Sequence, residues 1–392
     1  MLQSLWSLRD GFRFLKLVRS SARAPADDYA PPAALIVPCK GLDDDLRLNA
    51  ERFLSLDYPC YQLIFVVASR RDLAFRFLTD LLASSSGSGR ARGYQKASVV
   101  VAGEPEDNGE KVNNLLAGVA AAEVEAEVFA FADIDASVQP GWLDALVAPL
   151  RDPAVTVSTG YRWYLPGARF GSRLRAAWDT SIAMMFGNDR KNFAWGGSMA
   201  IRSSDFRKLG IAEHYWRQTV SDDYAITRAV RAAGGSIRFE PRCLVANRGE
   251  TSFREFLRWS TRQIVITRVY APHYWRAGFA FYTLYALTFL FGVVLFVAPG
   301  VPLSQRIAAA LLLGSIMGLG TAKGVLRARA ARALFPDDVE LRGRKGGCYW
   351  RQAPLVAWVM LFNFAAAAFL RRIEWGNIVY ELRSRDKLAI IG

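Results

Sequence analysis

Short apolar runs alternate with helical patterns in the first part of the chain. Runs of this length, bounded by polar residues, predict buried β-strands, and the stretches between them predict helices. The predicted strands are Leu35–Val37, Leu63–Val67, Val99–Val101 and Val128–Phe131. Strands that alternate with helices in this way predict an α/β fold with a mostly parallel sheet.

The pattern changes in the middle of the chain. Residues 161–199 are rich in aromatic side chains and show no regular period, so we predict irregular structure there. A helix is predicted from Ser221 to about Ala233, where Gly234 and the next glycine end it. A further helix is predicted from Ser252 to about Val269.

Three apolar stretches follow, at Phe279–Pro299, Pro302–Ala322 and Pro354–Leu370. A helix needs about 20 residues to cross a bilayer, and the first two stretches reach that length. The third is shorter, and Arg371 follows it. We predict a span there too, with a re-entrant or buried helix as the alternative.

The net charge of +14 is concentrated in the membrane-proximal C-terminal half. Anionic lipid headgroups account for it better than nucleic acid, because no nucleic-acid-binding motif accompanies the charge. The loop between the second and third apolar stretches is basic, so the positive-inside rule places it and the large N-terminal domain in the cytoplasm. The first 20 residues mix apolar and basic side chains at near-helical spacing, which predicts an interfacial amphipathic helix.

These patterns divide the chain into four parts. Residues 1–30 are the interfacial helix and a linker, and residues 31–250 are the α/β domain. Residues 251–278 are a membrane-proximal helix, and residues 279–392 are a transmembrane region of about three spans with a basic cytoplasmic loop.

Carboxylates are the candidates for acid–base chemistry. The chain has two histidines, His214 and His273, and contains neither the nucleophile-elbow motif nor the P-loop motif. The four cysteines are scattered without the paired spacing of a zinc site.

Asp133 and Asp135 stand directly after a predicted strand. Ligands bind at the carboxyl ends of strands in open α/β sheets, and carboxylate oxygens hold magnesium or manganese against a diphosphate. The alternative is that an aspartate caps a helix that begins near Pro140.

Asp222 and Asp223 lie in the first turn of the helix that Ser221 begins. Adjacent carboxylates disfavour each other's charge, which suits a general base that takes a proton from a hydroxyl. The alternative is that both simply favour the positive end of the helix dipole.

In this order the motifs resemble family 2 glycosyltransferases of the GT-A fold, and most closely the ceramide glucosyltransferase branch. The resemblance runs from about Leu35 to the C-terminus. It is carried by the motifs above together with Pro38-Cys39-Lys40-Gly41, Leu56-Asp57-Tyr58-Pro59 and Lys111-Val112-Asn113-Asn114. It implies a GT-A-like mostly parallel sheet domain with a C-terminal transmembrane helical region.

The resemblance also implies roles for the donor site. Asp72 would contact the nucleotide, and Lys111 and Asn114 would bind the donor. Asp133 would bind the donor diphosphate and the metal, and Asp135 would extend it to an Asp-x-Asp pair.

On the acceptor side, the resemblance implies that Asp223 is the catalytic base. Trp195, Gly196 and Gly197 would form a gate beside the acceptor, because glycine lets the backbone approach a substrate closely.

A motif near the membrane matches only in part. Arg258 and Trp259 fit the branch and would bind the donor, but Glu255 stands where the branch has Gln or Arg, which reverses the local charge. Cations on this helix would neutralise a leaving diphosphate or would meet lipid headgroups.

The implied function is inverting transfer of a hexose, glucose from UDP-glucose, onto a lipid such as ceramide. The enzyme would be a multi-pass integral membrane protein that uses magnesium or manganese, with its active site facing the cytoplasm. The alternatives are a processive polysaccharide synthase, a polyprenyl-phosphate sugar synthase and a membrane scaffold that has lost catalysis.

Overall fold

The computed structural model describes residues 2–21, 28–85, 94–343 and 345–391, so residues 22–27 of the predicted linker lie outside the described residues. The chain forms two compact units, each built from separate segments. The sheet unit contains residues 20–163, 186–247 and 374–392. The helical unit contains residues 1–19, 164–185 and 248–373.

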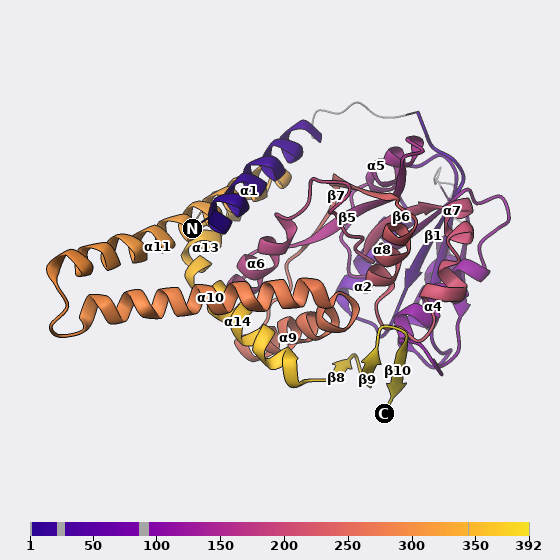
Figure 1. Ribbon diagram of the computed structural model, residues 1–392. Helices are drawn as coiled ribbons and strands as arrows, with labels where there is room; N and C mark the ends of the chain where they lie inside the picture. The colour runs from indigo at the N-terminus through magenta and orange to yellow at the C-terminus, as the bar shows by residue number, and fades with distance from the viewer. Residues whose placement is uncertain (1, 22–27, 86–93, 344, 392) are drawn as a thin grey trace. The chain divides into compact units, whose positions relative to one another are not determined.

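A seven-stranded sheet in the order β3-β2-β1-β4-β6-β5-β7 forms the centre of the sheet unit (Figure 1). β3, β2, β1 and β4 are parallel, whereas β6 runs antiparallel to β4 and to β5. The strands are β1 (Ala33–Pro38), β2 (Tyr61–Val67), β3 (Tyr94–Val101), β4 (Val128–Ala132), β5 (Val155–Tyr164), β6 (Ser198–Arg202) and β7 (Ser236–Asn247). The four predicted strands and the mostly parallel sheet are confirmed.

Helices cover both faces of this sheet, because side chains alternate between the two faces along each strand. In β1, Leu35 and Val37 belong to the core on one face, and Ala34 and Ile36 belong to the core on the other. The first face is covered by α2 (Asp44–Phe53), α3 (Leu73–Ser85) and α5 (Trp142–Val147). The second is covered by α4 (Glu110–Ala120), α7 (Ser203–Lys208) and α8 (Asp222–Ala232).

Helices α10 (Pro272–Val297) and α11 (Leu303–Leu334) are long and apolar enough to cross a membrane. They cover the first two predicted spans except residues 298, 299 and 302, and each helix also extends beyond its predicted span at one end. The third stretch forms α14 (Ala353–Phe369), which is bent by 61° from the helical segment before it. Within the described residues it reaches the length of a span only if the bent pair is counted as one.

The prediction of irregular structure over residues 161–199 is wrong for part of that range. β5 continues to Tyr164, and α6 (Phe170–Ala183) forms a 14-residue helix in the helical unit. Its buried residues, which include Ala177, Trp178 and Asp179, lie on successive positions. Because α6 is covered on most sides, its sequence lacks the polar face that gives a helix its period.

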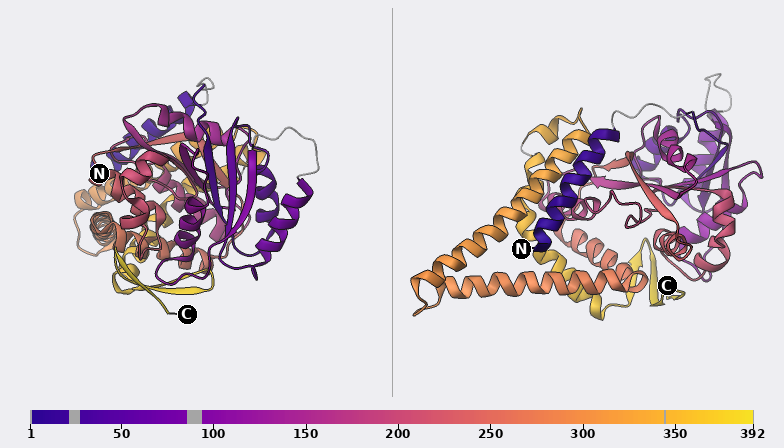
Figure 2. Two further views of the ribbon diagram at one scale, coloured as in Figure 1. Left: turned by 90° about the vertical axis from the view of Figure 1, so that its right-hand side faces the viewer. Right: turned by 45° about the horizontal axis from the view of Figure 1, so that its top comes forward.

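At the N-terminus, α1 (Leu2–Ser21) is a helix with one buried face, formed by Gly11, Phe14, Leu15 and Val18. This face packs within the helical unit, where α1 lies beside α11 (Figure 2). A Cβ built on Gly11 would lie 3.0 Å from Leu326 Cδ1 of α11. The amphipathic helix is therefore present, and its place at a membrane interface stays a prediction.

The end of the chain forms a second sheet, in the order β10-β9-β8, which the sequence analysis did not predict. Its strands are β8 (Arg372–Trp375), β9 (Ile378–Ser384) and β10 (Lys387–Ile390). In the sheet unit, the Tyr380 hydroxyl accepts a hydrogen bond from the Glu110 amide at 3.1 Å, and Arg228 pairs with Asp386 at 2.5 Å. The strands escape notice in the sequence because they are short and carry many charges.

Close packing of α4 on the sheet generates a prediction. A Cβ on Gly118 would lie 2.4 Å from Ile36 Cγ2, so Gly118→Ala should destabilise the protein even though alanine favours helices. Overpacking of this kind costs about 1–3 kcal/mol, and the melting temperature of the detergent-purified protein should fall by several degrees.

The matched control is Gly318→Ala, inside α11, where a Cβ would meet no atom within 4 Å. It should leave the melting temperature unchanged or raise it. Equal effects of the two substitutions would contradict the close approach of α4 to the sheet.

Candidate active site

The carboxyl end of β4 carries a cluster of charges from four elements of the sheet unit. Asp133 and Asp135 follow β4, Lys111 comes from α4, Arg162 from β5 and Asp222 from the start of α8. Their charges alternate, so each carboxylate has at least one cation beside it.

Lys111 connects two of the carboxylates. Its ammonium nitrogen lies 2.7 Å from Asp133 Oδ1 and 3.3 Å from Asp222 Oδ1. Burial works against the charged lysine, but the two carboxylates outweigh it and raise the pKa of Lys111 above its usual value. The structure thus places the predicted donor-binding Lys111 beside the predicted diphosphate-binding Asp133.

Arg162 connects the other pair. One guanidinium nitrogen, Nη2, lies 3.0 Å from Asp133 Oδ2 and 2.6 Å from Asp135 Oδ1. The same guanidinium sits over the Trp195 ring at 5.1 Å. The sequence analysis missed Arg162, although it is the one charged residue in the sequence of β5.

Asp133 and Asp135 do not cap α5. The N-cap of α5 is Gly141, and it has no side-chain capping bond. Burial works against ionisation of Asp133, but Lys111 and Arg162 outweigh it and lower the pKa of Asp133. This removes the capping alternative for α5 and leaves Asp133 as a carboxylate held between two cations.

Asp222 is the most enclosed member of the cluster, with 3% of its side chain exposed. Burial raises its pKa to about 7, against the opposing effect of Lys111 and with a further rise from Asp223 and Asp133. Its Oδ2 is buried without a hydrogen-bond partner among the residues that the structure describes.

The two glycines of the predicted gate touch these carboxylates. A Cβ on Gly196 would lie 1.9 Å from Asp222 Oδ2, and a Cβ on Gly197 would lie 2.6 Å from Asp133 Oδ2 and 2.3 Å from the Trp195 ring. Neither position has room for a side chain, so the glycines let the backbone close over the buried carboxylates.

Asp223 differs from its neighbour in exposure. It is half-buried, and its Oδ1 accepts hydrogen bonds from Ser221 Oγ at 2.5 Å and from the Tyr224 amide at 2.7 Å. Because adjacent residues of a helix point about 100° apart, Asp222 faces Lys111 while Asp223 lies toward the more open side.

Asp72 lies in the same unit, in the loop after β2 and directly before α3. Its Oδ1 accepts hydrogen bonds from the Gly41 amide at 2.8 Å and from the Ala74 amide at 2.9 Å. Gly41 has a φ of +67°, which favours glycine, so Asp72 fixes the turn after β1. Its predicted contact with a nucleotide stays a prediction.

The Asn114 side chain makes no hydrogen bond to the charged cluster in the described part of the chain. Its side chain is buried one helical turn from Lys111, and its Oδ1 has no hydrogen-bond partner in the described part of the chain. The proposed contact between Asn114 and a donor stays a prediction.

Arg258 and Trp259 belong to α9 (Phe253–Tyr270) of the helical unit. Arg258 is exposed, and the Trp259 ring packs edge-on against Tyr164 at 5.4 Å and Trp178 at 5.2 Å. Trp259 therefore has a packing role within its own unit, and the donor contacts of both residues stay predictions.

Glu255 has a structural explanation in the same helix. Ser252 caps α9, and Glu255 completes a capping box by accepting a hydrogen bond from the Ser252 amide at 2.8 Å. The bonds to Ser252 lower the pKa of Glu255, so the residue stabilises the start of the helix as an anion.

The cluster has the hard oxygen atoms that a divalent metal prefers. No group of three or more His, Cys, Asp or Glu side chains in the described ranges is arranged to hold a metal. However, Asp133 and Asp135 each direct an oxygen to one point, where Arg162 Nη2 now lies. The two carboxylates fit a shared cation at that point.

The mostly parallel sheet, with Asp133 and Asp135 at the carboxyl end of its central strand β4, agrees with the fold that the resemblance to GT-A glycosyltransferases implies. The comparison with known families supports the predicted class of glycosyltransferase but gives another family number than the predicted family 2: the chain matches Glycosyl transferase family 21 over residues 3–388. The protein belongs to glycosyl transferase family 21.

Solved structures also resemble the chain at low identity. One is GalNAc-T7 with UDP, GalNAc and Mn²⁺, which is 12% identical with a TM-score of 0.41 over 62% of this chain. The chain spans about half of the length of GalNAc-T7, since the match covers 50% of that chain. Another is glucosyl-3-phosphoglycerate synthase from Mycobacterium tuberculosis with Mn²⁺ and UDP-glucose, 13% identical with a TM-score of 0.38, covering 65% of this chain and 82% of that one.

The raised pKa of Asp222 generates a prediction with a defined sign. In an unfolded chain an aspartate titrates near 3.9, so between that value and about 7 the folded protein binds the extra proton. Stability should therefore fall as pH rises through this window. Relative to Asp222→Asn, the wild type should lose a few degrees of melting temperature between about pH 5 and pH 8, the shift expected for about 1–2 kcal/mol.

The difference between the two melting temperatures at each pH removes the contribution of groups that titrate alike in both proteins. Lys111 and Asp133 keep their charges across this range. Parallel pH profiles for the wild type and Asp222→Asn would show that Asp222 does not titrate there.

Proposed function

We propose that the protein transfers a hexose, glucose from UDP-glucose, to the hydroxyl group of a membrane lipid such as ceramide, with inversion at the anomeric carbon. The observation that carries this proposal is the cluster at the end of β4, where Lys111 and Arg162 hold Asp133 and Asp135 beside the two glycines. Family membership supports the reaction class.

The donor diphosphate would bind at Lys111 and Arg162. Both cations are held near the sheet edge by carboxylates, and ammonium and guanidinium groups bind phosphate oxygens through charge-assisted hydrogen bonds. When a divalent metal is bound, Asp133 and Asp135 would hold it, and it would offset the charge that develops on the departing diphosphate. Arg162 would then turn from the carboxylates toward the phosphate.

Asp223 would act as the general base. Two hydrogen bonds fix its Oδ1, so its orientation is set before an acceptor arrives. The Oδ2 atom would take the proton of the acceptor hydroxyl while that oxygen attacks the anomeric carbon opposite the diphosphate. Asp222 is unsuited to this role because it is buried against Lys111 and Gly196.

The acceptor class is supported by the helical unit. α10 and α11 are long and apolar enough to cross a bilayer, and their exposed side chains include Leu284, Leu287 and Leu311. Such a surface suits a lipid environment. We propose an integral membrane protein whose acceptor stays in the membrane and whose sheet unit faces the cytoplasm, on the side of the basic loop.

Transfer of radiolabel from UDP-glucose by the purified, detergent-solubilised protein tests this proposal. Ceramide, diacylglycerol and polyprenyl phosphate would be offered in turn, with magnesium or manganese, and the products separated by lipid chromatography. Label in ceramide supports the proposal. Label in polyprenyl phosphate or in a polymer would assign another acceptor, and absence of transfer with several sugar nucleotides would favour a scaffold.

The role of Asp223 gives a separate prediction. Asp223→Asn should lower turnover by about 10²–10⁴-fold, the usual contribution of a general base. The affinity for UDP-glucose should stay within a few-fold of the wild type, because the base touches the acceptor rather than the nucleotide. Single-turnover kinetics and donor binding would be measured on the same preparation.

Asp205→Asn is the matched control, because Asp205 also lies in the first turn of a helix, α7. It should keep wild-type turnover. Wild-type turnover in Asp223→Asn would overturn the assignment of the base.

A further inference from the structure

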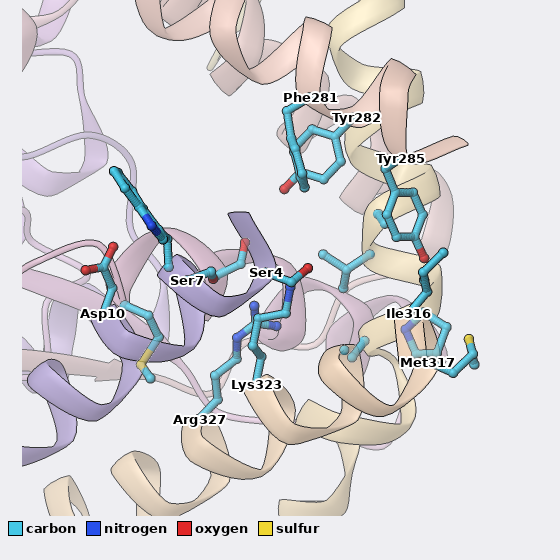
Figure 3. Close-up of a pocket in the computed structure, with 18 of the residues that line it drawn as sticks. Ser4, Ser7, Asp10, Phe281, Tyr282, Tyr285, Ile316, Met317, Lys323 and Arg327 are labelled. Carbon is cyan, nitrogen blue, oxygen red and sulfur yellow. The ribbon is translucent and has the colours of Figure 1, made fainter. Parts of the chain in front are cut away.

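The helical unit contains a cavity of about 310 Å³ that the proposed reaction does not use. Its walls come from α1, from the end of α6 and from α10, α11 and α14 (Figure 3). A volume of this size is at the lower end of the range for small-molecule sites, about 300–1,000 Å³. The lining is mixed, with apolar residues such as Phe281 and Ile316 beside hydroxyl and charged groups.

Two cations of α11 line this cavity. Lys323 and Arg327 are four residues apart, so they lie on the same face of the helix, and Figure 3 shows both side chains extending toward the cavity. Arg327 is 8% exposed. Its one protein hydrogen bond among the described residues goes to the Ala177 carbonyl at 3.3 Å.

No carboxylate of the described residues neutralises these cations. Neither Lys323 nor Arg327 has an acidic side chain within ion-pair distance in that part of the chain. The one acidic residue in the lining, Asp10, pairs with Arg13 on its own helix at 3.1 Å. Because an enclosed charge is costly unless a counter-charge meets it, the cavity is suited to an anion.

Hydroxyl groups complete the lining. Tyr282 and Tyr285 come from α10, on the side of the cavity opposite Lys323 and Arg327, and Ser4 and Ser7 come from α1 (Figure 3). Two cations with several hydroxyl donors are the groups that bind a phosphate, which offers several acceptor oxygens.

The position of Lys323 along α11 suggests where such a phosphate is met. Lys323 lies 20 residues after Leu303, the first residue of the helix. At helical rise this is about 30 Å, which equals the thickness of the hydrocarbon core of a bilayer. If the first part of α11 crosses the membrane, as proposed above, Lys323 reaches the headgroup layer on the other side.

We propose that this cavity binds a phosphate group through Lys323 and Arg327, with the hydroxyl groups around it as further donors. The headgroup of a phospholipid and a free phosphate both offer this chemistry. The placement of this site in the headgroup layer rests on the proposed function, because it assumes that α11 crosses the membrane. The positive charge of the cavity does not depend on that function.

Lipid retention by the purified protein, measured by native mass spectrometry without a sugar nucleotide, tests the proposal. Phosphatidic acid and diacylglycerol with the same acyl chains differ by the phosphate alone. The wild type should retain phosphatidic acid in preference to diacylglycerol. Lys323→Gln should weaken this retention about tenfold, the effect of losing one charge-assisted hydrogen bond.

Two further variants sharpen the test. Lys323→Arg should restore retention, and Arg329→Gln, which removes an exposed cation from the same helix, should leave it unchanged. Lys323 is preferred over Arg327 for substitution because Arg327 also bonds to α6, so its loss could disturb folding.

Competition with inorganic phosphate separates the two sources. Retention that millimolar phosphate does not reduce supports a lipid headgroup, and displacement by phosphate supports a free phosphate. Equal retention of the two lipids, or wild-type retention by Lys323→Gln, would overturn the proposal. Because retention needs no sugar nucleotide, it can hold even if the transfer assay with UDP-glucose fails.

Discussion

The ion pairs of Lys111 are the interaction on which the site depends. A single ammonium group holds Asp133 at the end of β4 and Asp222 at the start of α8, while Lys111 itself belongs to α4. Without this cation, several carboxylates would face one another in a partly buried space, and enclosed charges that lose their partner cost about 3–5 kcal/mol. The lysine thus fixes the positions of three elements and keeps the carboxylates in one place.

That arrangement also separates the roles of adjacent residues. Asp222 is buried against Lys111 and the backbone of Gly196, whereas Asp223 is half-buried with its Oδ1 fixed by the start of α8. The structure thereby gives two neighbouring aspartates different surroundings, and in the proposed reaction only Asp223 takes the proton. The same close packing requires glycine at position 196, because any side chain at Gly196 would collide with Asp222.

The strands, the apolar helices and the aspartate pairs could be predicted from the sequence. Each is a local pattern, either a repeat of apolar positions or a pair of residues at the end of an element. The part of Arg162 in the site and the ion pair of Lys111 with Asp222 could not be predicted, because these contacts join residues that are far apart in the chain. α6 was missed because burial on most sides removes its polar face, and β8 to β10 because short charged strands resemble loops. Family resemblance supplied Trp195 and its glycines, which no local pattern would have marked.

The central claim is that Lys111 assembles the donor site, and UDP-glucose affinity in the double variant Lys111→Met, Asp222→Asn tests it most directly. The asparagine removes the buried charge that the lost lysine would leave unpaired, so we expect this variant to fold and to report on donor binding alone. Calorimetry with manganese should show affinity reduced by about tenfold or more, the loss expected for a charge-assisted phosphate contact, while Lys96→Met, which breaks a more exposed ion pair, keeps wild-type affinity. Wild-type affinity in the folded double variant would contradict the account.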